Sequence, residues 1–365
     1  MPDQAQILVA RSLLSENEET RYQRLIEYFC DRTVSCSEVE DGWLLTLGWQ
    51  NSPERYKDPN ILQGLGWWSP SLTVSEVPFA IRQDYGFQLA LNDCWSLFAW
   101  SRWLSSRAMQ NGLPNELVLL HVDDHDDLMS PRVVRPEQCW VDAVTRQEFS
   151  LLSPASVSSA IESGGIGIGS FIVPLLYQVP RVHIRHLCVT GYNTCRRGVH
   201  SLEHGSVRDE LLAPGALRQA VRLQSIPAGQ VPAGHSYRVA SNPSDWLAAL
   251  PQAPVLLHLD LDFFNNRFNG DSDWRNRPAR HDPPLADILA SVDGIFASLT
   301  AEGVLEKVVN ITVAISPRFF PAEFWEPTVN AIRAHVQKLF NTTACPGEDC
   351  SIRASKADKA DVSHG

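Results

Sequence analysis

Two short runs of the sequence place acids and histidines directly after strongly apolar residues. In the first, LVLLHVDDHDD, Asp123, His125 and Asp127 stand at alternate positions, and four of the last five residues are acidic. Carboxylates this close repel one another and destabilise a fold unless a cation or strong donors compensate. Because alternate side chains share one face of an extended strand, the run predicts a DxHxD set of metal ligands.

The second run, VLLHLDLDFFNN, repeats the arrangement with Asp260 and Asp262. Functional residues of open α/β sheets gather at the C-terminal ends of strands, which is where both runs place their acids. Four carboxylates and one imidazole are hard donors that favour Mn²⁺, with Zn²⁺ or Fe²⁺ as alternatives. Carboxylates that bridge two ions hold them about 3.5 to 4 Å apart, so we expect a two-metal hydrolytic site.

Each motif has an ordinary structural explanation. A lone DxD is usually a solvated turn or a helix cap, and a lone HxD is usually a hydrogen-bonded pair. Two such motifs, each directly after an apolar strand, favour the metal site. His121 and His258 precede Asp123 and Asp260 by two residues and are expected deeper on the same strand faces. There they orient the carboxylates through hydrogen bonds or, alternatively, transfer protons.

The surrounding pattern predicts an α/β fold. From residue 86, short apolar runs alternate with helix-like segments, as in a mainly parallel sheet wrapped by helices. One helix is expected within 93–112. The expected strands are 87–91, 117–122, 186–192, 255–261 and 307–315.

The N-terminal part has a different pattern. A helix over 11–30 and a strand over 44–49 precede a segment rich in Pro, Gly and Trp, which reads as a long loop or lid. Its Trp67 and Trp68 pack in the core or line a binding face. The expected organisation is an N-terminal extension with the Trp-rich loop packed on the core (1–85), a metal-hydrolase core (86–340) and a flexible tail (341–365).

Charge and cysteine usage narrow the class of partner. The chain has 31 basic and 42 acidic residues and a net charge of −11, which disfavours nucleic acids and anionic membranes as partners. The acidic start and the lack of a long apolar run predict a cytoplasmic protein without signal peptide or membrane span. Eight cysteines without CxxC spacing are expected to be free thiols.

Four motifs carry a family resemblance: HVDDHDD, GIGSF at 167–171, DLDFFNNRFNG and ISP at 315–317. With them the chain resembles the arginase and deacetylase superfamily, most closely the peptide arginases and their uncharacterised relatives, over roughly 86–320. Those enzymes convert arginine residues of ribosomally made peptides into ornithine and urea. The resemblance implies a three-layer α/β/α fold, two Mn²⁺ ions and an arginine-containing precursor peptide as partner.

The resemblance also implies roles for the ligands. Asp123 and Asp260 would bridge both ions, Asp127 would bind the first ion, and His125 with Asp262 would bind the second. A hydroxide between the ions would attack the guanidinium carbon, and Asp127 would orient this hydroxide.

Other roles concern the leaving group and the substrate. A nearby imidazole, with His121 and His258 as candidates, would help to protonate the departing amine. Ser170 in GIGSF would contact substrate, or else belong to a tight turn packed near the metals. Glu323 and Glu326 are candidates for a contact with the guanidinium.

One position departs from the family pattern. Arginases supply a further histidine from a turn after an earlier strand, whereas this chain has Asn92, Asp93 and Cys94 there. Asp93 is the expected replacement, being a hard oxygen donor, while Cys94 would suit zinc. An added anion would weaken the acidification of bound water. The alternatives therefore stay open: hydrolysis of a free guanidine, amide deacetylation, or a non-catalytic metal-binding scaffold. The oligomeric state is left open as well.

Overall fold

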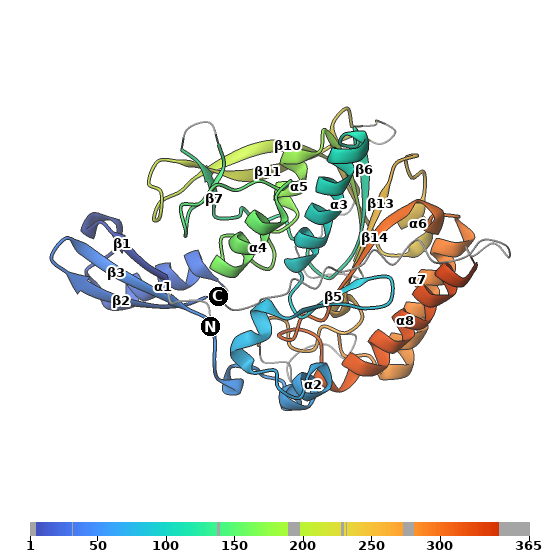
Figure 1. The fold of residues 1–365 in the computed structure, drawn as a ribbon, viewed down its shortest axis with the longest axis horizontal. Coiled ribbons are helices and arrows are strands. Elements are labelled where there is room, and N and C mark those ends of the chain that lie inside the picture. Colours follow the sequence, from blue (N-terminus) through green and yellow to red (C-terminus); the bar gives the residue numbers. More distant parts are fainter. Residues whose placement is uncertain are drawn as a thin grey trace, which may run out of the picture.

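The computed structural model describes residues 5–342 apart from 31, 137–138, 189–197, 228–229, 231 and 273–280. Within these residues the chain is a mixed α/β protein with an 11-stranded sheet and a separate 3-stranded sheet near the N-terminus (Figure 1). The expected α/β class and the large central sheet are confirmed. Most of the expected tail, 343–365, lies outside the described residues.

The middle of the large sheet is parallel. Its six strands, in spatial order, are β5 (Gln88–Ala90), β14 (Val308–Ala314), β13 (Val255–Asp260), β6 (Glu116–Val122), β9 (Arg181–Leu187) and β12 (His235–Ala240). The two motif-bearing strands, β6 and β13, are therefore neighbours and end at the same sheet edge. The strand expected at 186–192 begins earlier, at Arg181, and its expected end lies partly outside the described residues.

Both margins of the sheet are antiparallel. At one margin β4 (Ile81–Gln83) pairs with β5. The other margin contains β10 (Gly198–Arg208), β11 (Leu217–Ser225), β7 (Val133–Arg135) and β8 (Val141–Asp142). The sequence pattern predicts none of these five strands, because they are short or only half-buried and lack a continuous apolar run.

Helices cover both faces of the sheet (Figure 1). Leu117 and Leu119 of β6 pack with the helices of one face, and Val118 and Leu120 pack with those of the other. Burial on both faces explains why the strand is uniformly apolar. The first face carries α3 (Trp95–Asn111), α4 (Pro154–Ser163) and α5 (Val173–Gln178), and the second carries α2 (Ile61–Trp68), α6 (Pro243–Leu247), α7 (Leu285–Ala301) and α8 (Trp325–Thr342).

Residues 5–48 form what we call the N-terminal module. Its strands β1 (Ala5–Val9), β3 (Gly42–Gly48) and β2 (Thr33–Val39) pair antiparallel in that order. Helix α1 (Glu18–Phe29) begins later than the pattern predicts, because the Asn17 side chain caps it by accepting a hydrogen bond from the Thr20 amide at 2.9 Å.

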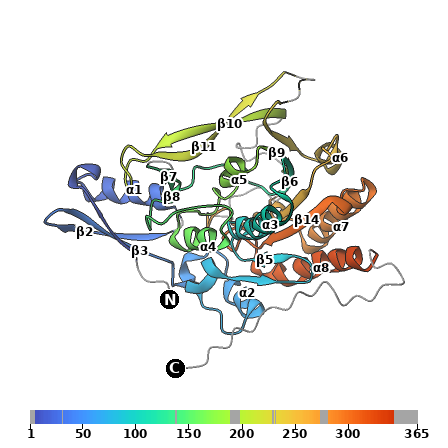
Figure 2. The ribbon, with the colours of Figure 1, turned by 45° about the horizontal axis from the view of Figure 1, so that its top comes forward.

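The module is tied to the rest of the protein. Leu25, Phe29 and Trp43 share an apolar cluster with Val134 of β7 and with Leu211. Figures 1 and 2 both place the module beside β7. Burial of this shared cluster fixes the module against the margin of the large sheet.

The Trp-rich segment contains more regular structure than a loop. It forms 3-10 turns at Pro53–Arg55 and Val74–Phe79 and helix α2, whose Ile61 and Leu65 are buried in the core. Trp67 and Trp68 pack partly buried against the same core. Of the two alternatives for these tryptophans, the structure shows core packing.

No described helix is long and apolar enough to cross a membrane.

Candidate metal centre

The two acidic motifs meet because β6 and β13 pair in register. Val122 lies opposite Leu259, so Asp123 and Asp260 follow at the same level, each only 1% exposed. The Oδ1 atom of Asp123 accepts a hydrogen bond from the His125 amide at 2.6 Å. In the same way Asp260 accepts one from the Asp262 amide at 2.9 Å. Each leading aspartate thus folds the next turn back so that the second motif residue joins it.

These turns correct the reasoning from strand alternation. Strand β6 ends at Val122, and the chain bends at once, so His125 and Asp127 converge through turns and not along an extended strand. Asp127 has a φ of 50°, a left-handed conformation that costs a non-glycine residue of order 1 kcal/mol or more. The same five residues meet as expected, but by a different local geometry.

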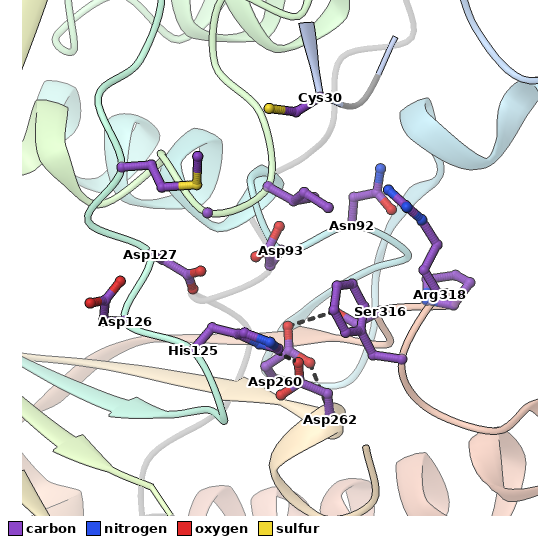
Figure 3. A pocket seen from close by; sticks show the side chains of 15 residues that line it. Cys30, Asn92, Asp93, His125, Asp126, Asp127, Asp260, Asp262, Ser316 and Arg318 are labelled. Atoms are coloured by element: carbon purple, nitrogen blue, oxygen red, sulfur yellow. Dashed lines mark hydrogen bonds and ion pairs between the residues drawn. The ribbon is translucent and has the colours of Figure 1, made fainter. Parts of the chain in front are cut away.

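A compact group of donors results. The His125 Nδ1 atom lies 2.9 Å from Asp262 Oδ2 and 3.5 Å from Asp123 Oδ1. One donor atom from each of these three residues falls within a common 4.8 Å, a spacing suited to one cation. Figure 3 shows Asp93 and Asp127 across the same cavity from Asp260 and Asp262.

The carboxylates are electrostatically unsatisfied without a cation. Burial, and then repulsion from neighbouring carboxylates, raises the pKa of Asp123, Asp127 and Asp260 well above its usual range. Among the described residues, Asp123 Oδ2 and Asp127 Oδ2 are buried with no hydrogen-bond partner. Burial lowers the pKa of His125, but the Asp262 carboxylate outweighs it and the pKa rises to about 11. Divalent ions would offset the repulsion between the buried carboxylates and would bind the oxygen atoms that have no hydrogen-bond partner. These residues therefore fit a metal centre.

Asp93 occupies the position where a further ligand is expected. It lies between β5 and α3, is 5% exposed, and lines the same cavity as His125 and Asp127. Its carboxylate contributes to the raised pKa of Asp123, Asp127 and Asp260. Cys94 is buried instead in the apolar cluster around α3. Of the two candidates, only Asp93 reaches the cavity.

Three buried histidines, His121, His186 and His258, lie on the side of the motifs away from the cavity and form hydrogen bonds to the motif backbone or to one another. A carbonyl oxygen only accepts, so His121 donates from Nε2 to the His125 carbonyl at 3.0 Å, and His186 donates from Nε2 to the Asp123 carbonyl at 3.0 Å. The His121 Nδ1 atom then accepts from His258 Nδ1 at 3.0 Å. None of the three lines the cavity described below.

Burial keeps these histidines neutral. It lowers the pKa of His121 well below 6.5, that of His186 to about 4 and that of His258 to about 3. His258 packs edge-on against Trp100, with ring centroids 6.1 Å apart. The sequence alone did not place His186, because its neighbourhood depends on the pairing of β9 with β6.

Two further polar residues hold the aspartates. Ser316, of the ISP motif, donates to Asp260 Oδ2 at 2.6 Å. Asn266 donates to Asp124 Oδ2 at 2.7 Å, which turns this aspartate away from the other acids. Asp124 therefore supports the loop and stands outside the candidate ligand set.

The donors open into a cavity of about 360 Å³, here called the metal cavity. Five aspartates line it, and the one arginine among its described lining residues, Arg318, is paired with Asp271 at 2.7 Å. Met129 and Ile168 form apolar walls, and Cys30 of the N-terminal module stands at the rim opposite His125 (Figure 3). A cavity this acidic favours a cationic ligand. The five aspartates are Asp93, Asp126, Asp127, Asp260 and Asp262.

Three candidates for substrate contact lie elsewhere. Ser170 is buried, and its hydroxyl bonds to the Gly167 backbone at 3.1 Å, closing the glycine-rich turn. Ser170 lines an adjoining cavity and not the metal cavity. Glu323 is paired with Arg267, and Glu326 is exposed at the start of α8, so neither lines the metal cavity.

Comparison with known proteins adds no relative. No family model matches the chain, and no curated protein matches it. The candidate centre is therefore defined by its own geometry: a buried, acidic and histidine-supported set of donors at the carboxyl ends of β6 and β13.

Proposed function

We propose that this chain is a metal-dependent hydrolase that converts arginine residues of a ribosomally synthesised peptide into ornithine and releases urea. The observation that carries the proposal is the convergence of Asp93, Asp127, His125 and the β13 aspartates on one acidic cavity, with the Asp123 carboxylate directly beside His125 and Asp262. We also propose that the fold is the three-layer arrangement of the arginase and deacetylase superfamily, with the N-terminal module as an extension. Helices on both sheet faces support that arrangement.

The donor set divides into two groups. Asp123 and Asp260, at the ends of the paired strands, would be shared by two Mn²⁺ ions, with Zn²⁺ or Fe²⁺ as alternatives. His125 and Asp262, which lie 2.9 Å apart, would complete one site. Asp127 and Asp93 would complete the other. Two such ions lower the pKa of bound water and stabilise developing negative charge.

The remaining chemistry belongs to side chains of the chain. During hydrolysis a water oxygen bonds to the guanidinium carbon, the bond from this carbon to the side-chain nitrogen breaks, and that nitrogen takes a proton. Asp127 lines the metal cavity, and its buried Oδ2 atom has no hydrogen-bond partner among the described residues. In this proposal Asp127 accepts the proton of the water and passes it on. His121 holds the His125 carbonyl and keeps the turn in place.

The charge of the cavity favours a guanidinium over a neutral amide. The Asp126 carboxylate lines the cavity half-buried, and its hydrogen bond comes from the Leu128 amide at 3.3 Å. This leaves capacity to receive N–H groups of the substrate. The volume of about 360 Å³ lies within the range of roughly 300 to 1,000 Å³ that is typical of small-ligand sites.

Mass spectrometry tests the proposal directly. The Mn²⁺-loaded protein is incubated with a library of arginine-containing peptides and, separately, with free arginine, agmatine and acetyl-lysine peptides. Hydrolysis lowers the mass of a peptide by about 42 Da for each arginine converted. If only free arginine or agmatine is hydrolysed, the substrate is a small guanidine and not a peptide. Hydrolysis of acetyl-lysine peptides would indicate a deacetylase. Binding of two ions without any turnover would indicate a non-catalytic scaffold.

A further inference from the structure

A second cavity of about 350 Å³ adjoins the metal cavity. The two share three lining residues, Cys30, Met129 and Ile168, so a ligand can pass from one to the other across these side chains. Met129 is 57% exposed although its side chain is apolar. An apolar side chain left open between two cavities is a surface for the aliphatic part of a ligand.

One wall of the second cavity comes from the N-terminal module. Arg24, Glu27 and Tyr28 of α1 line it, opposite Ser130 and Ser170 of the core. Near the rim Arg24 pairs with Glu210 at 3.7 Å, an exposed ion pair whose charges cancel. The distinctive charge of this cavity therefore comes from its deeper residues.

Two arginines, Arg132 and Arg218, form the deeper part. Arg132 is 6% exposed and donates to the Tyr28 and Gly164 carbonyls. Arg218 donates to the Pro131 carbonyl at 2.9 Å and to the Ser130 carbonyl. Among the described residues neither guanidinium forms an ion pair with a carboxylate. Neutral carbonyls bind the N–H groups but leave both positive charges in place.

Two acidic residues, Glu27 and the Arg24-paired Glu210, line the cavity, and a third, Asp209, lies outside its lining. Asp209 is buried and accepts hydrogen bonds from the Tyr28 hydroxyl at 2.5 Å and from the Leu211 and Ala213 amides. Its charge lies behind the tyrosine and does not line the cavity. With three arginines and two glutamates among its lining residues, the second cavity is more basic than the metal cavity beside it.

We propose that the second cavity binds a carboxylate of the substrate, supplied by an acidic residue that neighbours the reactive arginine in the peptide. This inference rests on the proposed function. The metal cavity receives the guanidinium, Met129 and Ile168 contact the aliphatic part, and Arg132 with Arg218 attract the carboxylate. The hydroxyl of Ser170, which lines the same cavity, is a polar contact for the peptide. Charge-assisted hydrogen bonds from guanidinium to carboxylate are among the strongest available to a protein.

The first experiment uses the unmodified, Mn²⁺-loaded protein. Peptides with one arginine carry Glu, Gln or Lys beside it, on either side, and KM and kcat are measured for each. We expect the Glu peptide to have a KM lower by about tenfold than the Gln peptide on one side of the arginine, with kcat nearly unchanged. Free arginine and a peptide that ends in arginine test the α-carboxylate as the source of the charge. Equal KM values for Glu and Gln peptides on both sides would overturn the proposal, as would a preference for the α-carboxylate over every Glu peptide.

Substitutions of Arg218 test its part in the proposed carboxylate site. Arg218→Met should abolish the preference for Glu while Mn²⁺ loading stays at the wild-type level, and Arg218→Lys should retain part of it. Arg222→Met is the matched control, since Arg222 is an exposed arginine of the same strand and lines neither cavity. A preference that survives Arg218→Met in the folded protein would contradict the assignment. If this variant does not fold, the wild-type comparison decides.

Fluorescence anisotropy separates this inference from the proposed reaction. Labelled Glu and Gln peptides are titrated with the Mn²⁺-loaded protein, and binding is measured without reference to turnover. Tighter binding of the Glu peptide without hydrolysis would support the carboxylate site and refute the hydrolase. Hydrolysis with equal binding of the Glu and Gln peptides would support the hydrolase and refute the carboxylate site.

Discussion

The Nδ1 atoms of His121 and His258 lie 3.0 Å apart, so two buried histidines of neighbouring strands are hydrogen-bonded directly beneath the carboxylate cluster. The pair fixes both tautomers, because His121 must donate from Nε2 to the His125 carbonyl. His258 is left with an Nε2 acceptor that has no partner among the described residues. A neutral, oriented pair of this kind positions a loop and carries no charge into the centre.

His121→Phe should weaken Mn²⁺ binding by about tenfold to 100-fold, the usual effect of removing a group that orients metal ligands. Isothermal titration calorimetry measures the affinity, and His335→Phe, at a partly exposed residue paired with Asp293, is the control. At saturating Mn²⁺ the variant should regain most of its activity. If activity stays lost at full metal loading, His121 transfers a proton and the positioning role is wrong.

Asp93→Ala and Cys94→Ser decide which residue supplies the further ligand of the proposed metal centre. Asp93 lines the metal cavity and Cys94 is buried beside α3, so the first variant should lose about one ion per chain and the second should keep two. Elemental analysis of the purified, Mn²⁺-equilibrated variants gives the stoichiometry. Loss of an ion in Cys94→Ser alone would reverse the assignment.

Asp123→Asn should have opposite effects with and without metal. It removes a carboxylate shared by the two proposed sites, so stable loading of both ions should be lost. The metal-free variant should melt about 3 °C higher than the metal-free wild type, because the native state no longer contains a buried carboxyl group that must either carry a repelled charge or hold a proton which the unfolded chain has released. Differential scanning calorimetry in EDTA checks the second effect, with the surface change Asp293→Asn as control. Full retention of two ions would exclude Asp123 as a ligand.

Stability should respond to pH in a metal-dependent way. In the metal-free protein the pKa of Asp123, Asp127 and Asp260 is raised, and that of His125 rises to about 11. Above pH 7 the native state therefore holds protons that the unfolded chain has released. Each retained proton costs up to about 1.4 kcal/mol of stability per pH unit as the pH rises.

The buried neutral histidines act in the opposite direction only at lower pH. Their pKa values lie below 6.5, so their contribution to stability is complete once the unfolded chain has lost its protons, above about pH 7. Thermal unfolding between about pH 7 and 8.5 should thus show a widening difference between Mn²⁺-loaded and EDTA-treated protein. Mn²⁺ binding in weak buffer should release protons. A constant difference and no proton release would contradict the buried-carboxylate account.

The sequence predicts the central strands β5, β6, β13 and β14 and the acidic motifs for a simple reason, whereas it misplaces β9 and misses β12. Strands buried on both faces are apolar throughout, as in LVLLHV and VLLHLD, and the acids at their ends stand out. The convergence of His125 and Asp127 has another cause than the one predicted, because it depends on turns that the Asp123 carboxylate stabilises. Local hydrogen bonds of this kind compete with strand geometry and are hard to read from spacing.

Other features depend on tertiary packing that spacing does not encode. His186 joins His121 only through the pairing of β9 with β6. Helix α2 lies in a segment whose Pro, Gly and Trp content predicts a loop, yet Ile61 and Leu65 bury one helix face. Arg132 and Arg218 meet because β11 pairs with β7, which places Arg218 opposite Val134, and Tyr28 of α1 packs against both guanidinium groups.

Cys30, at the end of α1, lines both cavities, so the N-terminal module contributes part of the wall of each cavity, and the large sheet carries the candidate metal ligands. Residues on both sides of position 85 therefore line the same two cavities. If the proposed function holds, substitutions in α1 would change which substrates bind while the donor atoms on β6 and β13 stay in place. Under that function, the residues proposed to select the substrate, Arg132 and Arg218, are distinct from the donor residues at the ends of β6 and β13, so substitutions can change one set and leave the other intact.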